Sequence, residues 1–157
     1  MTRHQLLLAI DETEAGQAAV DFTIGFAARS HGQVTVLHVR ELPASSRVPP
    51  LESLDHARSL VEESVARLNQ AGVPADGIIY SAREPSVARC IVDTADERWC
   101  NGIVLGSFRL RGIRRLSGRK IREQVMRRST LPVIVAPPAL RPSLTDWPTG
   151  IDHIGAA

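Results

Sequence analysis

Apolar residues along the chain fall into five short continuous runs, separated by longer segments in which they recur every three or four positions. A continuous run of β-branched and apolar residues is typical of a strand buried on both faces. Apolar residues at three- and four-residue spacing are typical of a helix with one buried face. The pattern predicts strands at Gln5–Ile10, Gln33–Val39, Gly77–Tyr80, Gly102–Gly106 and Leu131–Ala136.

Four helices are expected between these strands. Gly32 and Gly72 follow the first two as stop signals, and Pro85 suits the first turn of the third. Three prolines between Glu41 and Pro50 predict a loop before the second helix. The predicted helices and their buried residues are 14–30 (Ala15, Ala19, Phe22, Phe26), 51–71 (Ala57, Val61, Val65, Leu68), a helix from Pro85 (Ala88, Ile91, Val92, Ala95) and 117–128.

Alternation of strands and helices predicts an α/β fold with a parallel, doubly wound sheet covered by helices on both faces. The 157 residues suit one core, which we place in residues 1–138. Residues 139–157 have no periodicity and are expected to form an extended or disordered tail. Trp147 in this tail is expected either to fold back on the domain or to pack on a dimer partner; the sequence leaves both open.

Composition indicates a soluble cytoplasmic protein. The first apolar run, Leu6–Ile10, is too short for a secretion signal, and no stretch approaches the roughly 20 apolar residues of a membrane helix. Cys90 and Cys100 fall on or just after one predicted helix, about 15 Å apart, which is beyond the reach of a disulfide. We therefore expect two reduced thiols and no metal site. Trp99 is expected to end that helix and pack against the core.

The charge is unevenly distributed along the chain. Between Gly106 and Arg128 there are nine basic residues and one acid, a net charge of +8 in a chain whose total is +2. This basic segment is where an anion would be bound. Phe108 is the only aromatic residue interleaved with it, so stacking on single-stranded nucleic acid is not expected, and a solvated helix face is the alternative.

Several classes of enzyme are excluded by missing motifs. The chain has neither a G-x-G-x-x-G nor a G-x-x-x-x-G-K-[ST] sequence, so neither an NAD enzyme nor a P-loop NTPase fits. Ser107 follows a predicted strand without the G-x-S-x-G elbow of a hydrolase. His38, at a strand end, is read as a core histidine rather than a catalyst.

The ends of the first and fourth strands place an acid opposite the basic segment. In a doubly wound sheet, ligands bind beyond the carboxyl ends of the strands where the strand order reverses. Asp11 follows the first strand, and Gly106 ends the fourth and opens the basic segment. Asp11 could take the base or ribose of a nucleotide while the basic segment holds its phosphates. Equally, Asp11 and Thr13 could simply cap the following helix.

These pieces, in this order and spacing, resemble the universal stress proteins over residues 6–137. The matching segments are Leu7-Leu-Ala-Ile-Asp11, Val34-Thr-Val-Leu-His-Val39, Gly102-Ile-Val-Leu-Gly-Ser107 and Leu131-Pro-Val-Ile-Val-Ala-Pro137. The resemblance implies a five-stranded parallel sheet in the order 3-2-1-4-5 with four helices. It also implies a homodimer through the fifth strand, at Val133, Ile134 and Val135. Pro132 and Pro137 would restrict that open edge to a short stretch.

ATP-binding members of that family carry a glycine, two residues, a glycine, nine residues, then a glycine and a serine or threonine. Counted on this chain, Gly106 supplies the first glycine, but Arg109, Arg119 and Lys120 occupy the other three positions. A shift by one residue would place Gly118 on the third glycine and Arg119 on the hydroxyl. Glu12 also replaces the glycine that follows the first-strand acid in the family.

The substitutions argue against ATP binding in the usual family manner and leave two outcomes open. Arginines could fill and neutralise the phosphate pocket, or their guanidinium groups could hold an anion directly. The resulting candidates for nucleotide or anion contacts are Asp11, Val39, Gly106, Arg109, Gly112, Arg119 and Lys120.

The resemblance implies a dimeric, non-enzymatic binding and signalling module in a stress response. One alternative is an ATP-binding stress protein with an arginine-rich phosphate loop and at most very slow hydrolysis. Another is a docking protein that offers its basic surface to an acidic partner. No cofactor follows with certainty, although ATP or another adenine nucleotide is compatible with the resemblance. Neither a membrane nor a specific nucleic acid is expected as a partner.

Overall fold

The structure is a computed structural model that describes residues 4–83, 86–107 and 114–138, with only the backbone described for residues 114–119. The predicted helix start at Pro85 lies outside these ranges. So do the predicted tail and Trp147 within it.

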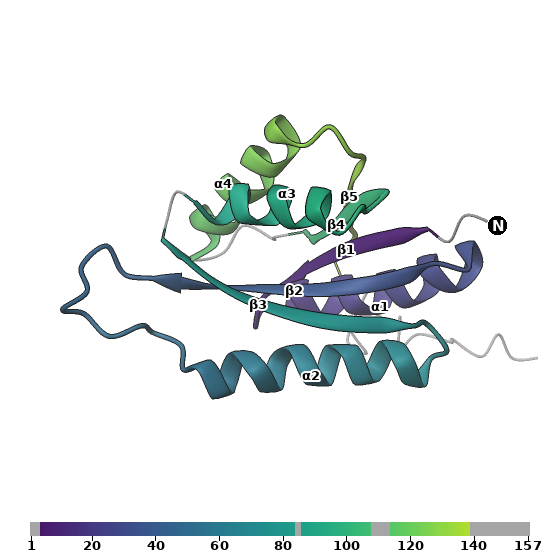
Figure 1. Cartoon of the computed structure of the whole chain (residues 1–157), viewed down its shortest axis with the longest axis horizontal. Helices are drawn as coiled ribbons and strands as arrows, with labels where there is room; N and C mark the ends of the chain where they lie inside the picture. The colour runs from purple at the N-terminus through teal and green to yellow at the C-terminus, as the bar shows by residue number, and fades with distance from the viewer. Residues whose placement is uncertain (1–3, 84–85, 108–113, 139–157) are drawn as a thin grey trace, which may run out of the picture.

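Five parallel strands form one sheet in the order β3-β2-β1-β4-β5, as expected. Figure 1 shows them with the helices that connect them. In the parallel pairing of β1 with its two neighbours, Leu8 lies beside Val36 on one side and Val104 on the other. The elements are β1 (Gln5–Ile10), α1 (Glu14–Ser30), β2 (Gln33–Leu42), α2 (Leu54–Gln70), β3 (Ala75–Arg83), α3 (Val87–Glu97), β4 (Gly102–Gly106), α4 (Arg114–Arg128) and β5 (Val133–Ala136).

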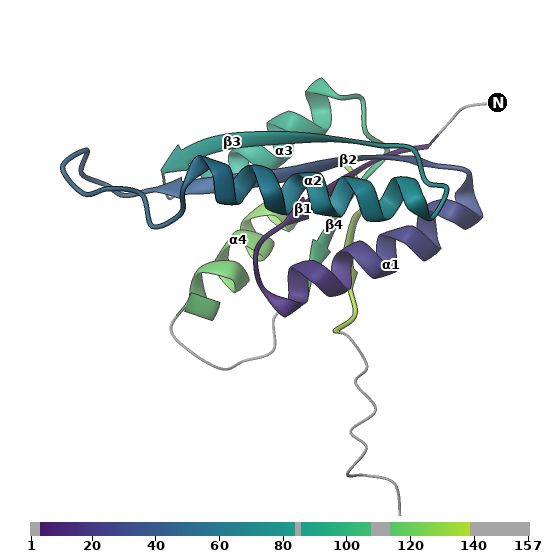
Figure 2. The same cartoon turned by 90° about the horizontal axis from the view of Figure 1, so that it is seen from below.

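Helices cover both faces of the sheet. In Figures 1 and 2, α1 and α2 lie on one face, and α3 and α4 lie on the other. Helix α1 packs on β1, β4 and β5, while α2 packs on β2 and β3. Helix α3 packs on β1, β2 and β3 and also contacts α4. The prediction of a doubly wound α/β fold is confirmed.

The start of β1 is tied to the start of β4 by a reciprocal pair of hydrogen bonds. The Gln5 amide donates to Asn101 Oδ1 at 2.8 Å, and the Asn101 amide donates to the Gln5 carbonyl at 2.7 Å. These residues lie 96 positions apart in the sequence. The pair fixes the register of the two central strands at their amino ends.

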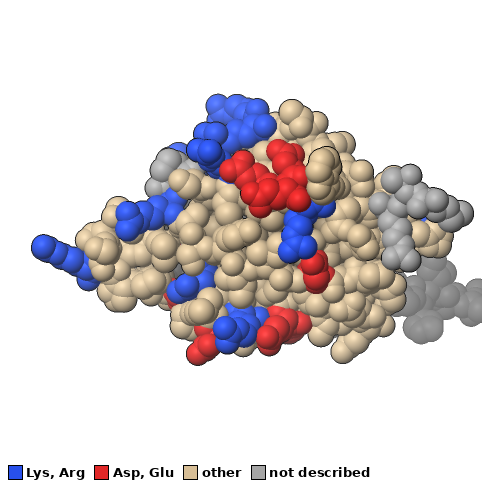
Figure 3. Space-filling view, viewed as in Figure 1, with Lys and Arg blue, Asp and Glu red and all other residues tan. Residues whose placement is uncertain are grey.

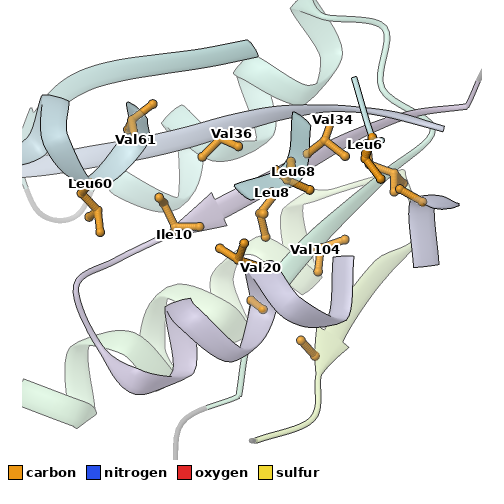
Figure 4. Packing of buried hydrophobic residues seen from close by; sticks show 14 residues of the cluster. Leu6, Leu8, Ile10, Val20, Val34, Val36, Leu60, Val61, Leu68 and Val104 are labelled. Atoms are coloured by element: carbon orange, nitrogen blue, oxygen red, sulfur yellow. The ribbon is translucent and has the colours of Figure 1, made fainter. Parts of the chain in front are cut away.

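Two hydrophobic cores lie on opposite faces of the central strands because neighbouring strand residues point in opposite directions. Leu8 belongs to the core under α1 and α2, shown in Figure 4, whereas Leu7 belongs to the core under α3 and α4. Both leucines are fully buried. The continuous apolar runs of the sequence therefore reflect strands that contribute to two cores at once.

The ends of several elements differ from the prediction. β2 and β3 are longer, because they pair with each other as far as Leu42 and Arg83, beyond the apolar runs. Helix α2 begins at Leu54 because Ser53 caps it, its hydroxyl accepting from the His56 amide at 3.1 Å. Helix α4 begins at Arg114, three residues earlier than expected, and β5 is restricted to 133–136.

The buried face of α1 was predicted wrongly in part. Ala19 is fully buried, as expected, but Ala15, Phe22 and Phe26 are only partly buried. The two phenylalanine rings stack at the margin of the core, with centroids 5.9 Å apart. The helix instead buries its small residues because it approaches the sheet closely; the buried positions are Gly16, Ala18, Ala19, Val20, Thr23 and Ala27. The predicted inner face of α3 is confirmed.

Trp99 does not pack against the core, contrary to the prediction. Its side chain is 87% exposed, and its backbone is left-handed, with φ of 53°. The Cys100 amide donates to the Ala95 carbonyl at 2.9 Å, and the Trp99 amide donates to the Asp96 carbonyl at 3.0 Å. This is the hydrogen-bond pattern with which many helices end, and glycine is the usual residue at the left-handed position. The turn therefore directs Trp99 into solvent.

We expect Trp99→Gly to raise the free energy of unfolding by about 1 kcal/mol, because a side chain in the left-handed region costs roughly 1–2 kcal/mol. Urea unfolding of both proteins measures the difference. Trp99→Ala is the matched control, because it removes the exposed ring and keeps the strained backbone. Equal stabilities of the glycine and alanine variants would contradict the prediction.

Both cysteines are free thiols with low reactivity. Burial raises the pKa of the Cys100 thiol to about 11. Burial is also the main cause that raises the pKa of Cys90, against an opposing hydrogen bond with Thr94. Since the thiolate is the reactive form, both side chains behave at neutral pH as small apolar groups. Among the described residues, no helix is long and apolar enough to cross a membrane.

Candidate ligand-binding site

The strand order reverses between β1 and β4, so their carboxyl ends mark the place where this kind of sheet binds ligands. Asp11 directly follows β1, and Gly106 is the last residue of β4. Val39 lies in the neighbouring strand β2, one residue beyond the position paired with Ile10. The structure therefore brings three of the predicted site residues to the same edge of the sheet.

Asp11 organises the turn into α1. Its Oδ1 atom accepts a hydrogen bond from the Thr13 amide at 3.0 Å and another from the Thr13 hydroxyl. Thr13 is the N-cap of the helix, and its hydroxyl accepts from the Gly16 amide at 3.3 Å. The capping role that the sequence left open is thus carried by Thr13 with support from Asp11. A contact between Asp11 and a nucleotide stays a prediction.

Two glycines allow α1 to approach the ends of both strands. A Cβ atom on Gly16 would lie 2.3 Å from the Asp11 carbonyl oxygen. A Cβ atom on Gly106 would lie 2.6 Å from the carbonyl oxygen of Ala15. Backbone contacts this short leave no room for a side chain. Gly106, chosen from the sequence as a phosphate contact, is therefore also required for helix packing, and Gly16 is a determinant of the site that the sequence reasoning missed.

Ser107 has a buried hydroxyl with unmet hydrogen-bonding capacity at this edge. It directly follows Gly106, and within the described ranges its Oγ atom is buried without a hydrogen-bond partner. Buried polar atoms are usually paired, so an unpaired one at a ligand edge is a notable feature. The sequence reasoning considered Ser107 only as a hydrolase nucleophile and missed it as a binding group.

Val39 and His38 lie side by side in β2 and point to opposite faces of the sheet. Val39 is partly buried and packs against the core under α3 and α4. His38 is 5% exposed and binds Glu52, in the segment between β2 and α2, through Nε2 at 2.8 Å. The interpretation of His38 as a core histidine is confirmed. Glu52 was missed because the sequence placed it in the first turn of the predicted helix 51–71, where a glutamate is ordinary.

The structure describes only some of the site residues predicted in the basic segment. Arg109 and Gly112 lie outside the described residues. Arg119 and Lys120 belong to α4, which begins five residues before Arg119, and the Lys120 side chain is exposed. The amides of both residues lie beyond the first turn and are used within the helix, so neither amide is free to bind a ligand.

Charged side chains of both signs lie on the described surface of the molecule. On the face seen in Figure 3, basic side chains are interspersed with acidic ones. Glu12, next to Asp11, lies 3.2 Å from Nε2 of His56 at the start of α2, and both side chains are more than half exposed. Within the described part of the chain, no group of three or more His, Cys, Asp or Glu residues could hold a metal ion.

This edge offers hydrogen-bond donors and acceptors for recognition. Asp11 supplies an acidic acceptor, Ser107 supplies a hydroxyl with no partner in the described part of the chain, and the strand backbone around Val39 flanks them. The basic residues of α4 follow β4 in the chain and bring positive charge after it. Such a combination suits a small ligand with a polar, neutral part and an anionic part.

Comparison with known proteins supports the fold. A universal stress protein family member from Burkholderia pseudomallei is 22% identical, with a TM-score of 0.69 over 86% of this chain and 96% of that one. The Archaeoglobus fulgidus universal stress protein in complex with dAMP is 24% identical, with a TM-score of 0.64 over 87% and 100%. An Arabidopsis thaliana family protein with AMP bound is 17% identical, with a TM-score of 0.61 over 91% and 97%.

At these identities the solved structures establish the fold, and the family assignment comes from the sequence itself. Among curated protein sequences, none is significantly similar to this chain. The family model described as the universal stress protein family matches residues 2–137, which is most of the chain. The chain belongs to the universal stress protein family.

Proposed function

We propose that this protein is a non-enzymatic binding and signalling module of a stress response, which acts in the cytoplasm as a homodimer. Its site at the carboxyl ends of β1 and β4 takes an adenine nucleotide or a similar phosphate-bearing ligand. The observation that carries the proposal is the buried hydroxyl of Ser107 beside Gly106, which has no hydrogen-bond partner among the described residues. The dAMP and AMP bound to two structural neighbours support the choice of ligand class.

The phosphates are held by cationic side chains in this proposal, without a glycine cradle. Arg119 and Lys120 stand where ATP-binding relatives have a glycine and a hydroxyl, and their amides are engaged within α4. A guanidinium group offers several donors in a planar fork that matches phosphate oxygens. Asp11 would take the ribose or base, with Val39 beside it. Arg109 and Gly112 complete the predicted phosphate side.

The proposed dimer joins the β5 edges of two copies. β5 is an outer strand of only four residues, and Val133, Ile134 and Val135 are each partly exposed there. An outer strand presents unpaired backbone groups that a second copy can satisfy. Pro132 and Pro137 flank the strand, which would limit pairing to a short stretch.

The test of the ligand site is the thermal midpoint of the full chain with and without millimolar Mg-ATP, AMP or cyclic AMP. A nucleotide at 100 times its dissociation constant adds about 2.7 kcal/mol, which corresponds to roughly 5–11 °C for a domain of this size. We expect such a shift with at least one nucleotide, and a smaller shift for Arg119→Ala. Arg127→Ala, in the exposed last turn of the same helix, is the control.

The dependence of binding on salt concentration distinguishes this nucleotide site from the alternative, a basic surface that docks an acidic protein. Contacts between exposed charges weaken steeply as salt rises to physiological strength, whereas a site with buried hydrogen bonds weakens less. The strongly basic stretch before and within α4 is the observation that favours docking. If no nucleotide shifts the midpoint even at low salt, the nucleotide proposal is wrong and docking becomes the leading function.

A further inference from the structure

His38 is buried at the carboxyl edge of the sheet with both ring nitrogens facing oxygen atoms. Its Nδ1 atom lies 2.9 Å from the carbonyl oxygen of Ile10, the last residue of β1. Its Nε2 atom lies 2.8 and 3.0 Å from the two carboxylate oxygens of Glu52. The Glu52 side chain is 20% exposed, so the contact is largely shielded from water.

Hydrogen bonding limits where the protons of the pair can lie. A backbone carbonyl can only accept, so Nδ1 carries a hydrogen and donates it to Ile10. If Glu52 is ionised, its carboxylate also only accepts, and Nε2 then donates to it. Two arrangements therefore satisfy every group: an imidazolium cation against a carboxylate anion, and a neutral imidazole that accepts at Nε2 from a protonated carboxyl. If Glu52 moved away, a buried ring nitrogen would lose its partner, which costs the full desolvation of that group.

The pair joins three parts of the molecule that meet at the candidate site. Ile10 immediately precedes Asp11, and His38 immediately precedes Val39. Glu52 lies in the segment 43–53, immediately before the N-cap of α2. Most residues of this segment are exposed, and the segment projects from the end of β2 in Figures 1 and 2. Glu52 is thus a largely buried anchor of a mostly exposed segment.

Arg40 is the charged group next to the pair, and its buried Nε atom has no hydrogen-bond partner among the described residues. Arg40, two residues along β2, donates from Nη2 to the Glu52 carbonyl at 2.8 Å and from Nη1 to Ser81 at 3.2 Å. Arg40 therefore holds the backbone of Glu52, while His38 holds its carboxylate. The exposed Glu12–His56 pair links the same end of α2 to the turn after β1.

We propose that His38 and Glu52 form a positioning ion pair that fixes segment 43–53 and the start of α2 beside Asp11 and Val39. The pair thereby sets the shape of the adenosine side of the site. The effect of the pair on ligand binding rests on the proposed function. Its effect on the position of segment 43–53 does not.

The positioning is tested on ligand-free full-length protein by amide hydrogen exchange of residues 43–56. We expect Glu52→Ala to accelerate exchange there at least tenfold. Glu52→Gln should have a smaller effect, within about threefold, because its amide can donate to Nε2 of a neutral ring. The matched control is His56→Gln, which breaks the exposed pair on the same side of α2 and should leave exchange of 43–53 unchanged within about twofold.

Nitrogen-15 NMR of the His38 ring supplies a readout that simple destabilisation would not produce. Both ring nitrogens should carry hydrogen in the wild-type protein, and only Nδ1 should do so in Glu52→Gln. A singly protonated ring in the wild type would overturn the ion pair. Unchanged exchange of 43–53 in Glu52→Ala would overturn the positioning.

Nucleotide affinity of the same variants tests the consequence for the ligand. For the nucleotide that binds the wild type, we expect Glu52→Ala to raise the dissociation constant about tenfold. His56→Gln should raise it less than twofold. Faster exchange with unchanged affinity would overturn the role of the pair in shaping the site. If the wild type binds no nucleotide, the proposed function fails, while the exchange and NMR results still decide the positioning pair.

Discussion

Gly16→Ala is expected to lower the free energy of unfolding by about 2–3 kcal/mol, in the upper part of the range for overpacked positions. The new Cβ atom would lie 2.3 Å from the Asp11 carbonyl and 2.8 Å from Asp11 Oδ1. Because the first obstacle is backbone, a change of side-chain rotamer cannot relieve it. The first turn of α1 would have to move away from the ends of β1 and β4.

Gly25→Ala is the matched control in the same helix. Its Cβ atom would meet only the end of the Arg29 side chain, at 3.8 Å. Alanine is a better helix former than glycine, so this change should raise stability by about 0.5–1 kcal/mol. Urea unfolding of the three proteins gives both numbers. If both substitutions changed the free energy of unfolding in the same direction, the close backbone contact at Gly16 would not be the reason that this position needs glycine.

Val135→Lys is expected to convert the proposed dimer to a monomer. Val133 and Ile134 pack against the two cores, so Val135 can be changed with less damage to the subunit. A lysine on an outer strand discourages pairing with a second strand because pairing would bring two lysines together and bury their charge. Sedimentation velocity at micromolar concentration measures the mass of the wild type and the variant.

Val48→Lys is the control for this substitution. Val48 is 51% exposed in the segment between β2 and α2, away from β5, so the same chemical change should leave the mass unchanged. A wild-type protein that sediments as a monomer would contradict the proposed dimer. A variant that stays dimeric would place the contact on another surface.

The fold could be predicted from the sequence because each central strand is buried on both faces. Gln5–Ile10 and Gly102–Gly106 were placed at their observed ends, since an apolar run ends where burial ends. The same rule failed for β2 and β3. Beyond Val39 and Tyr80 these strands still pair with each other, but their side chains are more exposed. Hydrophobic patterns report burial, whereas pairing of the backbone leaves no such signal.

The candidate site was less predictable, because close backbone contacts and single polar pairs have no period. The acid after β1 and the glycine that ends β4 could be located from their positions after predicted strands. Gly16 could not, since a glycine within a helix has no signal that reveals what it touches. The contact between His38 and Glu52 joins positions 14 residues apart across a loop, and only the folded chain shows it.

The hydrogen bonds between Gln5 and Asn101 have a consequence for how the protein is made. β1 is synthesised first, yet one of its two neighbours, β4, follows some 96 positions later. Until the ribosome has released that part, β1 pairs on one side only and keeps an apolar edge open. Pairings this distant in the sequence form slowly and leave unfinished sheets prone to aggregation. We therefore expect the nascent chain to be most prone to aggregation between the emergence of β2 and the arrival of β4.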